Sequence, residues 1–263
     1  MFYYKQKLDN GITVVVEPIE KVRSVAVGFW VGVGSRHESA KEAGLSHFIE
    51  HLLFKGTKTR TASDISATFD SLGAELNAFT TKEFTCYYTR LLDEHLEVGI
   101  EILADMLQNS LFQPNHIDFE RQVVLEEIAM YEDTPDEQIH DLFTASLWPS
   151  HPLGSQVLGS KETVSAFNQD TVVNYWQRFY TPANIVVAAA GNVQPEQLIA
   201  LIKRYWQQPP TAKPTTAEIK PVTKAKLSVF SKQTEQTHLC YGGTTINSRH
   251  PDRFALSVLE NIV

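Results

Sequence analysis

The chain has 263 residues, of which 43% are hydrophobic and 21% are charged, and this globular composition excludes disordered, collagen-like and low-complexity proteins. Asp and Glu outnumber Lys and Arg by 31 to 23, and the resulting net charge of −8 argues against a nucleic-acid partner. No apolar stretch approaches the roughly 18 residues of a membrane span, and the N-terminus has no signal-peptide core, so a cytoplasmic protein without a membrane span is expected.

The chain order of strand and helix patterns predicts an α+β fold. Asn10-Gly11 supplies the positive φ angles of a tight hairpin turn between the first two strands. Strand patterns occur at 3–8, 12–16, 24–31, 75–80, 84–91 and 184–190. Helical patterns occur at 44–54, 61–72, 93–109, 115–132, 136–148, 161–166, 169–179 and 194–206. Because strands and helices do not alternate strictly, we expect a mostly antiparallel sheet with helices packed on one face.

The composition changes near residue 208. Residues 208–225 hold four of the twelve prolines and predict a linker after an N-terminal domain at 1–207. Strands are expected at 226–231 and 237–242, then a helix from 252 to the end. A strand, Ser-Arg-His and a helix occur in this order both early and late in the chain, which favours a divergent internal duplication. We therefore expect 226–263 to be the truncated start of a second homologous domain.

Cysteine usage excludes both a disulfide scaffold and a zinc site built from four cysteines, because the chain has two cysteines, Cys86 and Cys240. Each lies in an apolar, strand-like run, so two buried thiols are expected. The acidic stretch at 115–137 has two interpretations, a solvated helix and turn or a chamber wall that prefers basic peptides, and the sequence does not decide between them.

The helix expected at 44–54 has one apolar and one polar face. Its apolar stripe follows helical spacing and comprises Leu45, Phe48, Ile49, Leu52 and Leu53. His47, Glu50 and His51 fall on the opposite face, where two imidazoles one turn apart can reach one metal ion. In this H-x-x-E-H order, Glu50 can take the proton of a water that the zinc ion acidifies. The alternative is an ordinary solvated helix face.

A catalytic zinc ion needs a third protein ligand, and the helix at 115–132 offers two candidates. Glu127 and Glu120 fall within the apolar face of that helix, whereas Glu126 points the other way. A carboxylate in an apolar stripe is costly unless it is paired or binds a metal. The alternative to metal binding is an ion pair, for which the sequence offers three partners, Arg36, Arg90 and Arg121.

With this motif and these glutamates, the sequence resembles the pitrilysin/insulinase family of zinc peptidases. It is most similar to the bacterial processing proteases related to the mitochondrial processing peptidase β subunit. The similarity extends, in order, over most of residues 1–206. The matching segments include LDNGITVVVE at 8–17, VGFWVGVGSRHE at 27–38, AGLSHFIEHLLFKGT at 43–57, LGAELNAFTTKEFTCYY at 72–88, ERQVVLEEI at 120–128, HPLGSQVLG at 151–159 and FYTPANIVVAAAGNV at 179–193.

The resemblance implies a role for each candidate residue. His47 and His51 match the two histidine ligands of one zinc ion, and Glu127 matches the glutamate ligand. Glu50 matches the general base. Glu120 matches a second carboxylate that supports the catalytic site without binding the metal directly, as outer carboxylates that orient metal ligands do. The resemblance therefore implies an inverzincin site with one Zn²⁺.

The resemblance also implies how a substrate binds. Asn77, Ala78 and Phe79 match an edge strand next to the metal, where an extended peptide adds as a further β-strand. The family repeats this domain to enclose a chamber and works with a paired homologous subunit or as a homodimer. The second domain usually contributes an Arg/Tyr pair to the substrate, and 226–263 does not supply one, so the chain by itself need not be active.

Three functional hypotheses follow. The first is a zinc-dependent endopeptidase that hydrolyses short or unstructured peptides. The second is a non-catalytic relative that serves as a structural or partner subunit, and such relatives usually lack part of the motif that is complete here. The third is a non-peptidase domain with a chance motif, against which the third ligand and the collinear resemblance both argue. We expect the first.

Overall fold

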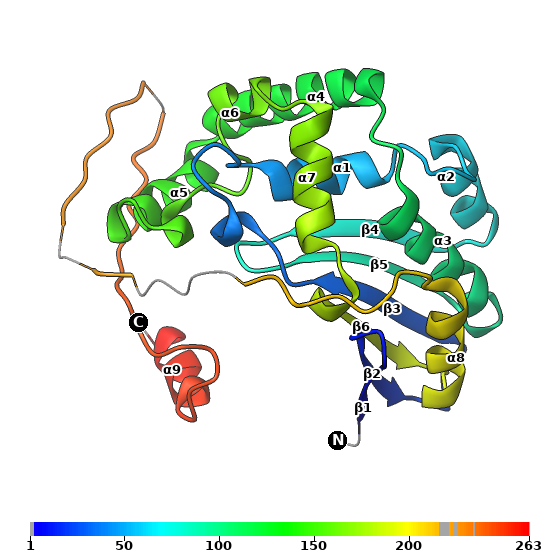
Figure 1. The fold of residues 1–263 in the computed structure, drawn as a ribbon. Helices are drawn as coiled ribbons and strands as arrows, with labels where there is room; N and C mark the ends of the chain where they lie inside the picture. Colours follow the sequence, from blue (N-terminus) through cyan, green and yellow to red (C-terminus); the bar gives the residue numbers. More distant parts are fainter. Residues whose placement is uncertain (1–2, 216–220, 224–225, 234, 263) are drawn as a thin grey trace.

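The computed structural model describes residues 3–215, 221–223, 226–233 and 235–262, and a six-stranded sheet forms its centre (Figure 1). The strands follow the order β1-β2-β6-β3-β5-β4. Their bounds are β1 Tyr4–Lys7, β2 Thr13–Pro18, β3 Ser24–Val31, β4 Glu75–Thr80, β5 Thr85–Leu92 and β6 Ile185–Gly191. β2 and β6 pair in parallel, and the other four strand pairs among the described residues are antiparallel, which confirms a mostly antiparallel sheet.

The helices agree with the predicted ranges to within about three residues at each end. Their bounds are α1 Leu45–Leu53, α2 Ala62–Ser71, α3 Leu96–Asn109, α4 Pro114–Glu132, α5 Pro135–Leu147, α6 Lys161–Ser165, α7 Gln169–Phe179, α8 Pro195–Tyr205 and α9 Arg253–Glu260. Short 3-10 turns connect several elements, namely η1 Ser35–His37, η2 Asp93–His95, η3 Pro152–Gly154 and η4 Pro182–Asn184. Within the described part of the chain, we find no helix with the length and apolar character that a bilayer crossing requires.

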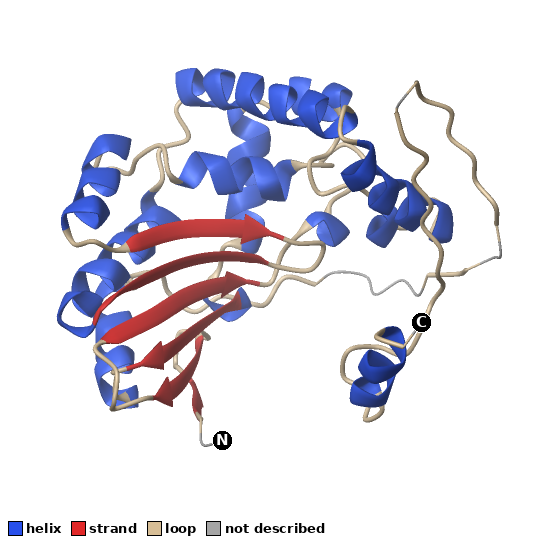
Figure 2. Ribbon diagram, turned by 180° about the vertical axis from the view of Figure 1, so that it is seen from behind, coloured by secondary structure: helices blue, strands red, loops and turns tan. Residues whose placement is uncertain are grey.

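The helices cover one face of the sheet and leave the other face open (Figure 2). Side chains alternate across a strand, and in β3 Val25, Val27 and Phe29 are buried in the core between the sheet and the helices. Ala26 and Trp30 point the other way and line a shallow cavity on the open face. Each large buried core side chain contributes about 1.5–3 kcal/mol, so this single layered core, from Leu8 to Trp206, holds residues 3–206 together.

The prediction of strands at 226–231 and 237–242 is wrong, because the described residues between α8 and α9 form neither a helix nor a strand. Both runs instead line a cavity against α5, together with Ile139, Leu142 and Phe143. A helix has no free backbone hydrogen-bonding groups along its side, so an apolar run that lies beside a helix cannot pair with it to form a sheet.

The same segment keeps much of its apolar surface in contact with solvent. Leu227 and Tyr241 are each 86% exposed. Cys240 is only partly buried there, so the predicted buried thiol is correct for Cys86 and wrong for Cys240. The interpretation of 226–263 as the start of a second domain stays a prediction, and the helix at its end is the element of that prediction that forms, as α9.

Candidate metal centre

Gly44 directly precedes helix α1, and the carboxylate of Glu38 caps the start of that helix. Gly44 has a φ of 96°, and a Cβ there would lie 2.6 Å from the backbone oxygen of Leu158. Glu38 accepts hydrogen bonds from the backbone N–H groups of Gly44 and Ser46, each at 2.7 Å, which satisfies donors that a helix leaves free at its start. Burial raises the pKa of this carboxyl to about 7.

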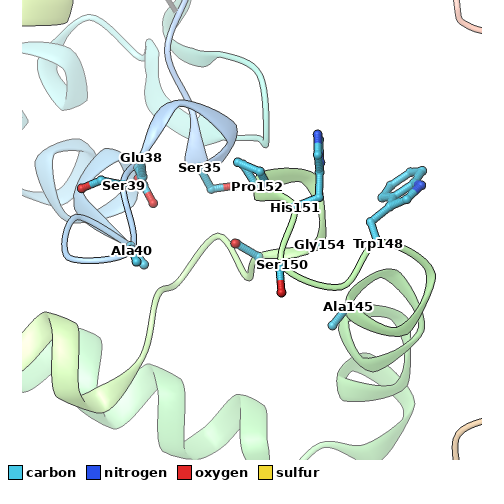
Figure 3. A pocket seen from close by; sticks show the side chains of 12 residues that line it. Ser35, Glu38, Ser39, Ala40, Ala145, Trp148, Ser150, His151, Pro152 and Gly154 are labelled. Carbon is cyan, nitrogen blue, oxygen red and sulfur yellow. The ribbon is translucent and has the colours of Figure 1, made fainter. Parts of the chain in front are cut away.

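Glu38 also lines a pocket of about 370 Å³ beside the start of α1 (Figure 3). The opposite wall comes from the end of α5 and the turn η3, with Trp148 and Pro152. The hydrogen bonds from Gly44 and Ser46 to Glu38 fix the N-terminal end of α1, and His47 follows directly after that end.

Three predicted side chains come together between α1 and α4. Glu127 Oε2 lies 3.7 Å from Nε2 of His47 and 3.7 Å from Nε2 of His51. One ligand atom from each of the three residues lies within 4.8 Å of the other two. The two imidazole rings meet edge to face with centroids 4.6 Å apart. The polar face of α1 is therefore turned inward, and His47 is only 8% exposed.

The cluster fits a zinc ion. A separation of 3.7 Å is too long for a hydrogen bond. Atoms that bind a tetrahedral zinc ion at about 2.0–2.2 Å stand about 3.3–3.6 Å from one another, close to the spacing here. Two imidazoles and one carboxylate with a fourth position left for water are the donor set of catalytic zinc sites. Burial, together with the charge of His51, lowers the pKa of His47 to about 3, so this ring is neutral and keeps a lone pair for a metal.

The second histidine is held by an outer carboxylate. Glu120 Oε2 lies 3.1 Å from Nδ1 of His51, so an Nδ1–H donates to it and leaves Nε2 free to face Glu127. Burial opposes protonation of His51, but the Glu120 hydrogen bond and the charge of Glu127 outweigh it and raise the pKa of this ring. The two rings therefore differ, because burial keeps His47 neutral whereas His51 is paired with the carboxylates of Glu120 and Glu127.

The helix-face argument for α4 agrees with where the structure places its glutamates. Glu120 is 1% exposed and Glu127 is partly buried toward the histidines, whereas Glu126 is exposed. None of the three arginines that could have paired with Glu120 or Glu127 does so. Each instead has another partner, in the pairs Arg36–Glu83, Arg90–Glu75 and Arg121–Asp118.

Glu50 lies on the same face of α1, between the two histidines in sequence. The hydroxyl of Thr80 on β4 donates a hydrogen bond to its Oε2. Burial raises the pKa of the Glu50 carboxyl, although the hydrogen bond from Thr80 opposes this. Sequence reasoning missed Thr80, yet strand alternation could have found it, because Thr80 follows Leu76 and Ala78 on the face of β4 that is turned toward the helices.

Strand β4, which carries Asn77, Ala78 and Phe79, is the last strand in the sheet order and so forms an edge. The backbone N–H of Ala78 donates to Oδ1 of Asn77 at 2.8 Å. Phe79 is 39% exposed on the open face, against Trp30. The strand edge next to Glu50 therefore carries main-chain groups that another strand could use.

Sequence reasoning also missed Lys55, whose Nζ lies 2.7 Å from Oε1 of Glu120. The signal was the four-residue spacing, which places Lys55 about one turn beyond His51 and just past the end of α1 at Leu53. Lys55 stands at the start of a tight loop, where Gly56 has a φ of +114° that favours glycine.

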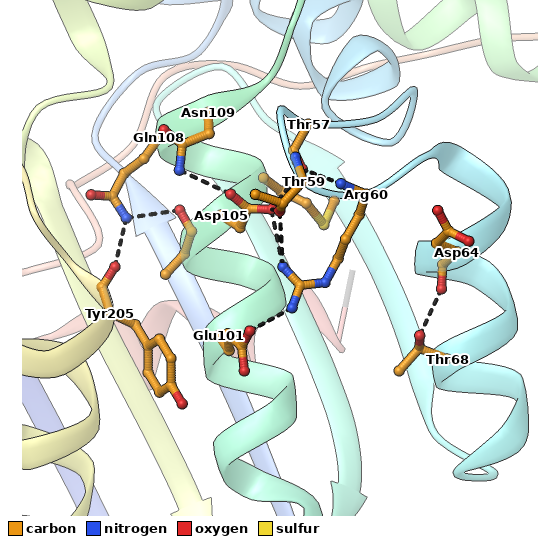
Figure 4. Close-up of polar contacts among 12 residues, drawn as sticks. Thr57, Thr59, Arg60, Asp64, Thr68, Glu101, Asp105, Gln108, Asn109 and Tyr205 are labelled. Atoms are coloured by element: carbon orange, nitrogen blue, oxygen red, sulfur yellow. Dashed lines mark hydrogen bonds and ion pairs between the residues drawn. The ribbon is translucent and has the colours of Figure 1, made fainter.

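This loop is tied to α3 through Asp105 (Figure 4). The Asp105 carboxylate accepts hydrogen bonds from the hydroxyls of Thr57 at 2.6 Å and Thr59 at 2.8 Å, and from Arg60 at 3.2 Å. Asn109 donates a further one, at 2.9 Å. One buried carboxylate thus anchors to α3 the loop that follows α1.

Removing that carboxylate should destabilise the fold. Asp105→Ala leaves the two hydroxyls without their acceptor and Arg60 with Glu101 as its remaining carboxylate partner, and we expect the free energy of unfolding to fall by about 3 kcal/mol. Urea titration followed by circular dichroism measures the change. Asp118→Ala, which removes a side chain that is 69% exposed and paired with Arg121, should cost less than about 1 kcal/mol. Equal losses in the two variants would contradict the assignment of Asp105 as the tie of the loop.

Comparison with known proteins agrees with the predicted family. Residues 13–161 match the family Insulinase (Peptidase family M16), and residues 166–263 match the family Peptidase M16 inactive domain. The chain therefore belongs to peptidase family M16, and the predicted resemblance is confirmed.

Relatives of similar sequence are named as zinc proteases. "Uncharacterized zinc protease YmxG" of Bacillus subtilis (strain 168) is 42% identical over 97% of this chain and 62% of its own length. "Uncharacterized zinc protease ML0855" of Mycobacterium leprae (strain TN) is 43% identical over 96% of this chain and 58% of its own length. The chain thus spans about three-fifths of the length of these curated relatives. Their names support a zinc peptidase.

The fold also has solved counterparts. The crystal structure of the periplasmic protease PqqL from Escherichia coli matches with a TM-score of 0.76 and 26% identity. The match covers 85% of this chain and 25% of that one. The predicted α+β fold of the pitrilysin/insulinase type is confirmed.

Proposed function

We propose that this chain carries the catalytic zinc site of an endopeptidase that hydrolyses short or unstructured peptides. The observation that carries the proposal is the convergence of His47, His51 and Glu127, whose ligand atoms lie within 4.8 Å of one another on the helix face that also carries Glu50. Membership of peptidase family M16 and the names of the relatives support it. The three converging side chains would hold one Zn²⁺.

The residues around the proposed zinc site have different roles in peptide hydrolysis. When bound, the zinc ion supplies a Lewis acid that acidifies water and polarises a peptide carbonyl. Glu50 takes the proton from the attacking water and then gives it to the departing amine. Burial raises the pKa of the Glu50 carboxyl, which makes its carboxylate a stronger base for the first of these steps. Glu120 holds the His51 ring in the orientation that presents Nε2.

The free edge of β4 suits an extended peptide. A substrate that adds to this edge as a strand uses its main chain for affinity, and a folded protein cannot present its chain in that way. Asn77, Ala78 and Phe79 would line the added strand. A second homologous domain or subunit, in a homodimer or a pair, would complete the cleft as a processing peptidase does. The cytoplasm stays the proposed location.

A second candidate is a non-catalytic partner subunit. It is favoured by the match of residues 166–263 to a family described as an inactive domain. The complete set of candidate residues at the metal centre favours catalysis instead.

Metal analysis together with a peptide assay tests the proposal. We expect one zinc ion per chain, and hydrolysis of an unstructured peptide that a chelator abolishes and added zinc restores. The assay is run with the chain alone and with the C-terminal part of YmxG added, because the cleft needs a second domain. A chain that binds no zinc would overturn the proposal. Zinc without hydrolysis in both assays would favour the partner subunit.

A further inference from the structure

Lys55 stands behind the metal centre, at the third position of a line of contacts that begins at the histidine ligand. His51 Nδ1 contacts Glu120 Oε2 at 3.1 Å, and Glu120 Oε1 contacts Lys55 Nζ at 2.7 Å. We propose that Lys55 is a positioning residue of the zinc site, which holds the Glu120 carboxylate in place so that it can orient His51. This inference rests on the proposed zinc site and adds a residue to it.

Glu120 needs a cation, because its side chain is only 2% exposed and carries a charge. Its two oxygens have different partners, the imidazole on one side and the ammonium on the other. Oε2 faces the imidazole at 3.1 Å and Oε1 forms an ion pair with the ammonium at 2.7 Å, so the carboxylate is held from both sides. An ionised carboxylate accepts the Nδ1–H of His51, whereas a protonated or rotated one would leave the tautomer and orientation of the ring unfixed.

Lys55 is built into position and does not merely reach the carboxylate from the surface. Its side chain is 33% exposed, and its ammonium lies 5.9 Å from the centroid of the Phe119 ring. The backbone turns sharply at Gly56 directly after it, and Asp105 fastens the rest of the loop to α3 (Figure 4). The loop therefore fixes the direction from which the ammonium approaches Glu120.

The same loop provides a matched control. Lys58 lies three residues further on, carries the same charge and is exposed. Lys55→Met and Lys58→Met change the net charge equally, so a general electrostatic effect would appear in both. Lys55→Arg keeps a cation that pairs well with a carboxylate.

The experiment measures zinc affinity by competition with a chromophoric chelator, and the ligand geometry from the visible absorption of the Co²⁺-loaded chain. We expect Lys55→Met to weaken zinc binding about 10- to 100-fold, the usual effect of removing an outer support of a metal ligand. Its Co²⁺ spectrum should change as well. Lys55→Arg should recover most of the affinity, and Lys58→Met should bind zinc as the unsubstituted chain does.

Circular dichroism checks that each variant is folded, and Lys55→Gln replaces the methionine variant if that one unfolds. A folded Lys55 variant with unchanged zinc affinity and an unchanged Co²⁺ spectrum would overturn the positioning role. Equal loss in Lys58→Met would overturn it too, because the effect would then be one of overall charge. If the unsubstituted chain itself binds no zinc, the proposed function fails, and that outcome is visible before any variant is compared.

Discussion

Glu50→Gln should keep its zinc and lose most of its turnover. The amide has nearly the shape of the carboxylate and can still accept the hydrogen bond from Thr80, so the helix and the three proposed ligands stay in place. It cannot take a proton from water, and the loss of a general base costs about 10²- to 10⁴-fold in rate. The measurement is kcat on an unstructured peptide, together with the zinc content of the same sample.

The control is Glu94→Gln, which makes the same chemical change at a residue of η2 whose side chain is 59% exposed. This variant should retain both turnover and zinc. A Glu50 variant with near-normal kcat would remove Glu50 from the role of base. A variant that lost its zinc as well would show that the carboxylate also supports the ligands.

The faces of α1 and α4 could be predicted from the sequence because each is a regular helix with a strong pattern. A period of 3.6 residues separates His47, Glu50 and His51 from the apolar stripe, and it separates Glu127 from Glu126. Which way those faces point in space depends on packing, and the structure supplies that. The polar face of α1 turns toward α4, so it is not the solvated surface that the same pattern would also allow.

Contacts between elements were harder to predict. Glu38 caps α1 across a loop, and Thr80 reaches Glu50 from a strand 30 residues away. Lys55 forms an ion pair with Glu120 on α4, whereas the sequence suggested three arginines as candidate partners for that carboxylate. Such pairs depend on where the chain folds back, and a periodicity within one element carries no information about that.

In the C-terminal segment, by contrast, the sequence has strand-like runs, but the described residues between α8 and α9 form no strand. Residues 226–231 and 237–242 are apolar, strand-like runs, but α5 is their neighbour and provides no strand to pair with. A strand is stable only where another strand takes up its hydrogen bonds. A strand in this segment would need a second strand beside it, and the local sequence pattern carries no information about such a neighbour. Without a sheet to cover it, Cys240 stays partly exposed.

Glu127→Gln should remove zinc from the chain almost completely. Replacing the carboxylate takes a negative charge from a cluster in which two neutral imidazoles would remain as the only other proposed ligands. Loss of an outer support costs about 10- to 100-fold in metal affinity, so loss of a direct ligand should exceed about 100-fold. Equilibrium dialysis against buffered zinc measures the affinity, and turnover should fall with zinc content.

Glu126→Gln is the matched control, since it makes the same change at the preceding residue of α4, where the side chain is exposed. Its zinc affinity and turnover should equal those of the unsubstituted chain. The pair of variants tests the helix geometry as well as the chemistry, because neighbouring positions on a helix point about 100° apart and only one of them can face the histidines. Zinc loss in the Glu126 variant, with normal binding in the Glu127 variant, would mean that α4 is rotated about its axis and that the proposed ligand set is wrong.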